Sequence, residues 1–254
     1  MPEAVRAAGT RGAAPAKRHR RRRWREGGPS VSGWNAEMLG WAVCLLGAGT
    51  IGAHVVGTVF PVETADSAAQ ALVWLCFAVP VVLALRRSLP RGLLRLRAVD
   101  LAYGIVFGVV LRGAQGVIAG LGGAPASWPT TFSTDGTLPS SFAAQAVAGT
   151  LVSPLLEEMF FRAVVLVCTF TVVRRLAGPI AAGVASVALS TVLFVVAHQL
   201  VGTPDAVDLA TLALLGVVAG AVVVGTGRLW PAVFVHIVFN ATGFAMLAVG
   251  TLLA

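Results

Sequence analysis

The stretch LVSPLLEEMFFRAVVLV, residues 151–167, places two adjacent glutamates and an arginine inside an apolar run. In a soluble protein these charges would face water, but the composition of the chain argues against a soluble protein. Of its 254 residues, 57% are hydrophobic and only 12% are charged, whereas a soluble domain carries roughly 25% charged residues. The sequence therefore predicts an all-α, polytopic transmembrane helix bundle.

Apolar runs long enough to cross a bilayer occur seven times. A spanning helix needs about 20 apolar residues. We expect about seven spanning helices, at residues 39–60, 68–85, 99–121, 142–173, 177–201, 208–226 and 230–253.

Basic residues occur in every second connecting loop along the chain. Residues 86–97, 174–175 and 228 contain arginines, whereas the loops at 61–67, 122–141 and 202–207 contain none and carry acidic residues. Cytoplasmic loops of membrane proteins are enriched in Lys and Arg. The pattern predicts a multi-pass protein of the cell membrane with a cytoplasmic N-terminus.

The N-terminal segment, residues 1–38, carries eight Arg and one Lys against three Glu and has no apolar periodicity. This composition predicts a disordered basic tail in the cytoplasm. Because no folded nucleic-acid-binding module accompanies it, we favour anionic lipids, contacted through residues 17–25, over nucleic acid as its partner.

Ionisable residues inside membrane helices are costly and mark functional sites by default. Glu158 and Arg162 are four residues apart, so they share a helix face in the favourable order for an ion pair. Glu157 is rotated by about 100° from its neighbour and is expected to face elsewhere. A structural triad in which both acids contact Arg162 is the alternative. Ser153 and Pro154 suit the start of a helix, so we also expect a helix break there.

Two further pairs are spaced by four residues: Phe194 with His198, and His236 with Asn240. Each pair lies on one face of its helix. A lone helical histidine is usually a satisfied core residue, but two histidines, an asparagine and a glutamate on three helices suit the activation of water. One base could deprotonate the water while donors hold an oxyanion.

These residues form the motifs EExxxR, FxxxH and HxxxN, in that order on successive helices. Together they resemble the CPBP family, which includes the type II CAAX prenyl endopeptidases and the bacteriocin-immunity, or Abi, proteins. The resemblance covers about residues 142–250. It implies a catalytic helix core at 142–254, preceded by transmembrane helices at 39–141 that carry no matching motif.

The resemblance implies an intramembrane endopeptidase acting on a peptide or a membrane-tethered protein. By analogy, Glu157 and His198 would activate water, His236 and Asn240 would stabilise the oxyanion, and Glu158, Arg162 and Phe194 would support the site. We favour a site without a metal ion. Zinc stays an alternative, with Glu157, His198 and His236 as its ligands.

Alternatives remain at this point. A non-catalytic immunity or scaffold protein of the same fold could bind a partner, and a transporter could use the same buried charges, although no inverted repeat supports it. Measured along straight helices, His236 and Asn240 lie roughly 10 Å nearer the cytoplasm than Glu157 and His198, so the side on which the cavity opens is undecided. Arg112 either snorkels or pairs with a carboxylate of the bundle, or it contacts a substrate carboxylate or a lipid headgroup.

Overall fold

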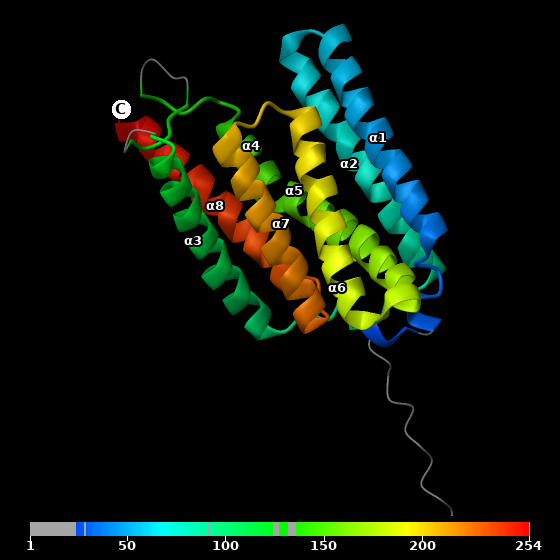
Figure 1. Ribbon diagram of the computed structural model, residues 1–254. Coiled ribbons are helices and arrows are strands. Elements are labelled where there is room, and N and C mark those ends of the chain that lie inside the picture. Colours follow the sequence, from blue (N-terminus) through cyan, green and yellow to red (C-terminus); the bar gives the residue numbers. More distant parts are fainter. Residues whose placement is uncertain (1–23, 28, 91, 124–126, 132–135, 254) are drawn as a thin grey trace, which may run out of the picture.

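The computed structural model describes residues 24–27, 29–90, 92–123, 127–131 and 136–253, except for the side chains of residues 62 and 63. The described part is a helical bundle (Figure 1). Its long helices are α1 (Ala36–Val59), α2 (Val62–Arg87), α3 (Ala98–Leu121), α6 (Leu166–Val201), α7 (Ala206–Thr226) and α8 (Trp230–Leu253). The short helices α4 (Phe142–Val147) and α5 (Ser153–Glu158) are joined by the π-helical segment η3 (Ala148–Val152), and a second π-helical segment, η4 (Met159–Val165), leads into α6.

Six helical segments of the described chain are long and apolar enough to cross a membrane. One of them, Phe142–Val201, is 60 residues long. It contains Gly178, whose φ of 80° and ψ of 178° interrupt the helix. In Figure 1 the chain turns back here, so this segment contains the two spans expected at 142–173 and 177–201. The expected count of about seven therefore agrees with the fold.

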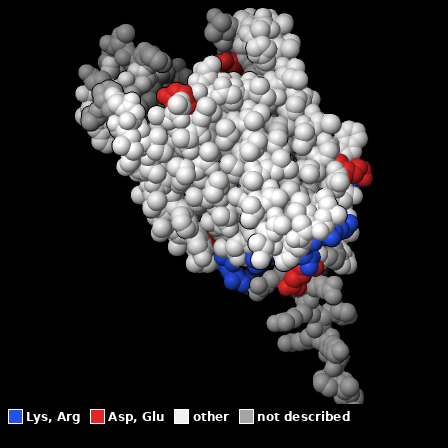
Figure 2. All heavy atoms as spheres, viewed as in Figure 1, with Lys and Arg blue, Asp and Glu red and all other residues white. Residues whose placement is uncertain are grey.

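The arginines gather at one end of the bundle, the lower end in Figure 2. We call it the arginine-rich end; it holds Arg86, Arg87, Arg95, Arg97, Arg174, Arg175 and Arg228. The loop between α6 and α7, residues 202–205, and the end of α8 lie at the opposite end (Figure 1). The chain is a multi-pass membrane protein.

The expected disorder of residues 1–38 is wrong for its described part; residues 1–23 lie outside the described residues. Trp24 is 2% exposed, and its indole Nε1 donates to the carbonyl of Gly227 at 2.9 Å. Trp34 is fully buried and donates to the carbonyl of Ser88 at 3.0 Å. The high charge of the segment predicts disorder, but the burial of these two large apolar side chains stabilises a folded conformation.

The most deeply buried stretch is the one that continues from the two glutamates. Residues 160–168 are all at most 1% exposed. This stretch crosses the bundle obliquely in Figure 1, between α1 and α2 on one side and α7 and α8 on the other. We call the continuous helical stretch from Ser153 to Cys168, which carries Glu157, Glu158 and Arg162, the central helix.

Helix α3 packs closely on α8 through two glycines. A Cβ atom at Gly104 would lie 2.3 Å from the Cβ of Phe234, and one at Gly108 would lie 2.7 Å from the side chain of Val238. Small residues allow the backbones of membrane helices to approach each other in this way. The close packing fixes the position of α8, which carries His236 and Asn240.

Candidate active site

Glu158 and Arg162 form the ion pair that their spacing predicts. The distance from Arg162 Nη1 to Glu158 Oε1 is 3.2 Å, and both side chains are 0% exposed. The guanidinium also lies over the ring of Phe194, 4.5 Å from its centroid. A buried charge is tolerated only when it is paired in this way.

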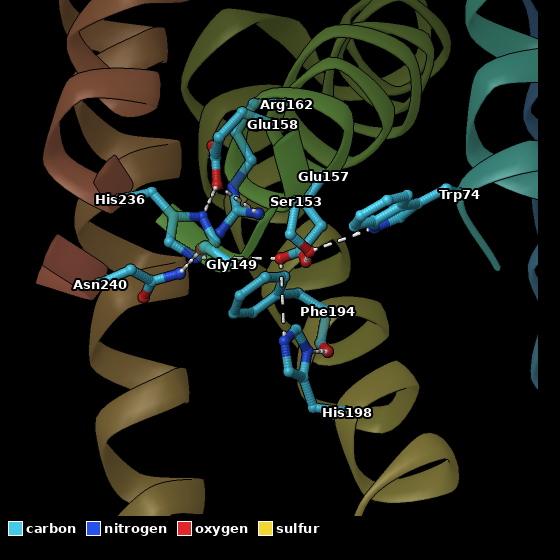
Figure 3. Close-up of polar contacts among 10 residues, drawn as sticks. All are labelled: Trp74, Gly149, Ser153, Glu157, Glu158, Arg162, Phe194, His198, His236 and Asn240. Atoms are coloured by element: carbon cyan, nitrogen blue, oxygen red, sulfur yellow. Dashed lines mark hydrogen bonds and ion pairs between the residues drawn. The ribbon is translucent and has the colours of Figure 1, made fainter. Parts of the chain in front are cut away.

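Glu158 also contacts the histidine of α8. Its Oε1 lies 3.0 Å from Nδ1 of His236, which is 3% exposed. A carboxylate oxygen accepts, so this nitrogen carries the proton. The contact joins α5 to α8 (Figure 3). The height difference expected from straight helices is absent, because the chain from Ser153 to Cys168 runs obliquely to the long helices (Figure 1).

Glu157 faces a different group of side chains. Its Oε2 lies 3.7 Å from Nε2 of His198 and 3.8 Å from Nε2 of His236, while its Oε1 accepts a short hydrogen bond from the Ser153 hydroxyl. Oε2 is buried and has no hydrogen-bond partner among the described residues. The two neighbouring glutamates therefore have separate environments, and the alternative triad in which both contact only Arg162 is excluded.

The tautomer of His198 follows from its other ring nitrogen. Nδ1 lies 2.8 Å from the carbonyl oxygen of Phe194, which can only accept, so Nδ1 is the donor. In the neutral ring, Nε2 is then an acceptor and faces Glu157 Oε2. Two acceptors at 3.7 Å do not bond to each other, but a water molecule could donate one hydrogen to each.

Phe194 packs among the charged groups. It is 0% exposed, and its ring centroid lies 4.4 Å from that of His198 and 5.8 Å from that of His236. The ring separates the Glu158–Arg162 pair from His198 and fixes the orientation of the histidine. Its place in the FxxxH pattern thus has a packing explanation.

The helix break expected at Ser153 and Pro154 is wrong. Both residues are helical, and the hydrogen-bond register changes instead, because the N–H of Ser153 bonds to the carbonyl of Ala148, five residues earlier. Proline has no N–H, so the carbonyl of Gly149 has no donor within the helix. The side chain of Asn240 supplies one, with its Nδ2 at 2.8 Å from Gly149 O.

A cavity of about 420 Å³ brings these groups together. Its lining includes Ser153, Glu157, His198, His236 and Asn240, together with apolar residues of α7 and α8. A second cavity of about 380 Å³ shares three lining residues with it and extends along the loop residues 202–204. The two cavities therefore adjoin, and we call them together the passage; they extend from Glu157 toward the end of the bundle opposite the arginine-rich end.

Arg112 lines the same cavity from α3. Its guanidinium stacks on the ring of Phe239 at 3.9 Å and donates to Thr242 Oγ1 at 3.3 Å, to the carbonyl of Phe239 at 2.5 Å and to Gln115 Oε1 in a short contact. No carboxylate of the described residues lies within ion-pair distance of it. Of the readings open from the sequence, pairing with a carboxylate of the bundle is excluded within the described residues.

Two residues of the site were missed in the sequence. Ser153 donates to Glu157, and Trp74 Nε1 lies 3.4 Å from the Ser153 hydroxyl oxygen. Ser153 precedes Glu157 by four residues, so the helical spacing could have revealed it. Trp74 comes from α2, and no local pattern connects it to the site.

Glu157, His198 and His236 are the donor types that zinc accepts. Each histidine also holds its Nδ1 against an oxygen, as metal-binding histidines do. In the described chain, however, no group of three or more His, Cys, Asp or Glu side chains is arranged to hold a metal ion. The chemistry of these donors fits zinc, whereas their present arrangement does not form a metal site.

Comparison with known proteins agrees with the motifs. Residues 139–242 match the family model described as "Type II CAAX prenyl endopeptidase Rce1-like". Searches of curated proteins and of solved structures gave no match. The matched segment contains all three motifs. It therefore includes Glu157, Glu158, Arg162, Phe194, His198, His236 and Asn240, and also Ser153. Residues 139–242 of this chain are thus similar to the Rce1-like family of type II CAAX prenyl endopeptidases.

Proposed function

We propose that this protein is an intramembrane endopeptidase in which Glu157 and His198 activate a water molecule for attack on a peptide bond. The single observation that carries the proposal is the pair of facing acceptors, Glu157 Oε2 and His198 Nε2, 3.7 Å apart at the edge of a cavity. The family, whose members act on membrane-associated proteins, supports the same reaction class.

Attack begins from a water that donates one hydrogen to each acceptor. As its oxygen bonds to the peptide carbonyl carbon, the transferred proton passes to Glu157. The carboxyl group then delivers this proton to the leaving amine as the carbon–nitrogen bond breaks. The products are a new carboxylic acid and a new amine, which together contain the oxygen and both hydrogens of the water, so no further reactant is needed.

The oxyanion would be held by His236 and Asn240. The buried cluster contains two carboxylates and one guanidinium, so one additional proton makes it neutral, and buried net charge is costly. We assign that proton to His236, because its Nδ1 already donates to Glu158. Its Nε2–H and the second hydrogen of the Asn240 amide then act as the donors.

We propose a metal-free reaction, with zinc on Glu157, His198 and His236 as the alternative. If zinc were bound, it would supply Lewis-acid activation of water. The distinction requires a chelator in the activity assay.

Substrate would reach Glu157 from the extracytoplasmic side. The arginine-rich end is cytoplasmic by the positive-inside rule, and the passage from Glu157 leads to the opposite end, along residues 202–204. We therefore expect a substrate peptide presented at the outer face of the membrane. In intact cells, a membrane-impermeant maleimide should label Thr203→Cys but not Arg175→Cys, with the native chain as background; the reverse pattern would overturn this assignment.

The test of the reaction is peptidase activity of the purified protein in detergent against a fluorogenic peptide library. The native chain and Glu157→Gln are compared, each with and without a chelator. We expect cleavage by the native chain only, unaffected by chelation. Loss of native activity with chelator would favour the zinc alternative. A folded native protein that cleaves nothing would favour a non-catalytic immunity or scaffold role.

A further inference from the structure

A third cavity, separate from the two at the candidate active site, lies at the arginine-rich end, between α3 and α7. Its volume is about 870 Å³, and four arginines contribute to its lining. They come from three separate places in the chain: Arg25, the pair Arg95 and Arg97, and Arg228. Figure 2 shows blue side chains gathered at the lower end of the molecule, where α3 and α7 end in Figure 1. This arginine cavity shares no lining residue with the cavity at Glu157.

Positive charge in the arginine cavity is only partly compensated. Arg228 bonds to the fully buried Asp100, with Nη2 and Nε at 2.6 and 2.9 Å from Oδ1. Arg95 and Arg97 are exposed, and no carboxylate of the described residues lies within ion-pair distance of either. Arg25 donates to the carbonyl oxygens of Val224 and Gly225 at 2.6 and 3.1 Å, so we assign anion binding chiefly to Arg95 and Arg97. Arginine binds phosphate oxygens in pairs.

The arginine cavity also has an apolar wall. Phe107 of α3 and Val218, Ala221 and Val222 of α7 line it. These residues extend from the arginines toward the middle of the bundle, into the part of the molecule that crosses the membrane. Tyr103 lies between the two zones and stacks on Phe107 with ring centroids 6.1 Å apart. Tyrosine is typical of the membrane interface. A soluble anion would use the arginines but not this wall.

We propose that the arginine cavity binds an anionic phospholipid, with its phosphate among the arginines and the upper part of an acyl chain against Phe107 and α7. The lipid belongs to the leaflet at the arginine-rich end, where basic pockets between membrane helices bind acidic headgroups. The lipid would occupy the cavity between α3 and α7 and so link these two helices. The proposal stands independently of the peptidase assignment.

The test compares lipid binding by three forms of the purified full chain. They are the native protein, Arg95→Gln/Arg97→Gln, and a control, Arg86→Gln/Arg175→Gln, which removes two other exposed arginines from the same end. Native mass spectrometry of protein in mixed micelles counts bound phosphatidylglycerol and phosphatidylcholine. The native chain should retain phosphatidylglycerol in preference to phosphatidylcholine. Arg95→Gln/Arg97→Gln should weaken that binding about 30-fold, and the control by less than about twofold.

A further variant tests the apolar wall without changing charge. Ala221→Trp fills the groove beside Phe107 and should displace phosphatidylglycerol while leaving any binding of inorganic phosphate or glycerol phosphate unchanged. Equal weakening in both arginine variants, or no preference for phosphatidylglycerol, would overturn the proposal. Displacement of the lipid by millimolar inorganic phosphate, with no effect of Ala221→Trp, would also overturn it and identify a soluble phosphate as the ligand.

Discussion

The polar cluster around Glu158 and the arginine cavity handle charge in opposite ways. In the cluster, Arg162 and Glu158 are 0% exposed and contact each other, and His236 completes the group. In the cavity, exposed Arg95 and Arg97 face an open volume of about 870 Å³. Buried charges that are matched within the chain hold the helices together, whereas open charges that are not matched are available to a ligand.

Glu157 is intermediate between these two cases. It is buried like Glu158, yet its Oε2 has no hydrogen-bond partner in the described chain and faces a cavity. The Oε2 of its neighbour, Glu158, also lacks a hydrogen-bond partner among the residues that the structure describes, but Oε1 of Glu158 contacts His236 and Arg162 at 3.0 and 3.2 Å, and Glu158 lines neither cavity of the site. The difference separates a carboxylate that stabilises the fold from one that is available for chemistry. Each of the following predictions tests this separation.

The largest effect is expected for Glu157→Gln. The amide keeps the shape and can still accept from Ser153, but it cannot take a proton from water. Peptidase kcat should fall by about 10²–10⁴-fold, the usual contribution of a general base, while the melting temperature in detergent stays within a few degrees of native. A large loss of stability with activity retained would reverse the roles that we give to the two glutamates.

Arg162→Met should act on stability instead. It leaves the buried Glu158 carboxylate without its guanidinium partner, and breaking a buried pair costs about 3–5 kcal/mol. Denaturant unfolding in mixed micelles measures the change. The double variant Glu158→Gln/Arg162→Met should recover a large part of the loss, because no charge is then left unpaired. Additive losses in the double variant would contradict the pairing.

Asn240→Ala should lower kcat by about 10²-fold, as removal of one oxyanion donor does, with a smaller change in KM. The substitution also removes the donor to Gly149 O, so a stability loss of about 1–3 kcal/mol should accompany it. Steady-state kinetics and unfolding measure the two effects separately. A change in stability with native kcat would leave Asn240 as a structural residue only.

The smallest effect is expected for Ser153→Ala. Its hydroxyl donates to Glu157, and hydrogen bonds to charged groups contribute about 1.5–3 kcal/mol. We expect kcat to fall by about tenfold and the free energy of unfolding to fall by no more than this amount. Trp74→Phe, which removes only a 3.4 Å contact to Ser153, is the matched control and should stay within about threefold of native. A larger effect of Trp74→Phe would place its indole nearer to substrate than the account does.

The parts of this site that were predictable from sequence are those set by helical spacing. The Glu158–Arg162 pair and the separate direction of Glu157 follow from a rise and rotation common to all α-helices. The contact between His236 and Glu158 depends on the oblique path of the central helix, which no local pattern encodes.

Other features depended on physical effects that a spacing argument omits. The helical chain does not break at Pro154; its hydrogen-bond register shifts there and leaves a carbonyl that Asn240 satisfies. The arginine cavity collects residues from three distant segments, so only the three-dimensional structure reveals it. The burial of Trp24 and Trp34 was hidden by the charge of the surrounding segment.

The most direct test of the central claim is a single-turnover cleavage in water enriched in ¹⁸O, with enzyme in excess over a peptide substrate. If Glu157 and His198 activate water, the new carboxylate of the product acquires one ¹⁸O in the first turnover, and Glu157 acquires none. If Glu157 instead attacks the carbonyl directly, hydrolysis at its own carboxyl carbon places ¹⁸O in Glu157, and the product receives an unlabelled oxygen. The account predicts the first result, and the second would contradict it.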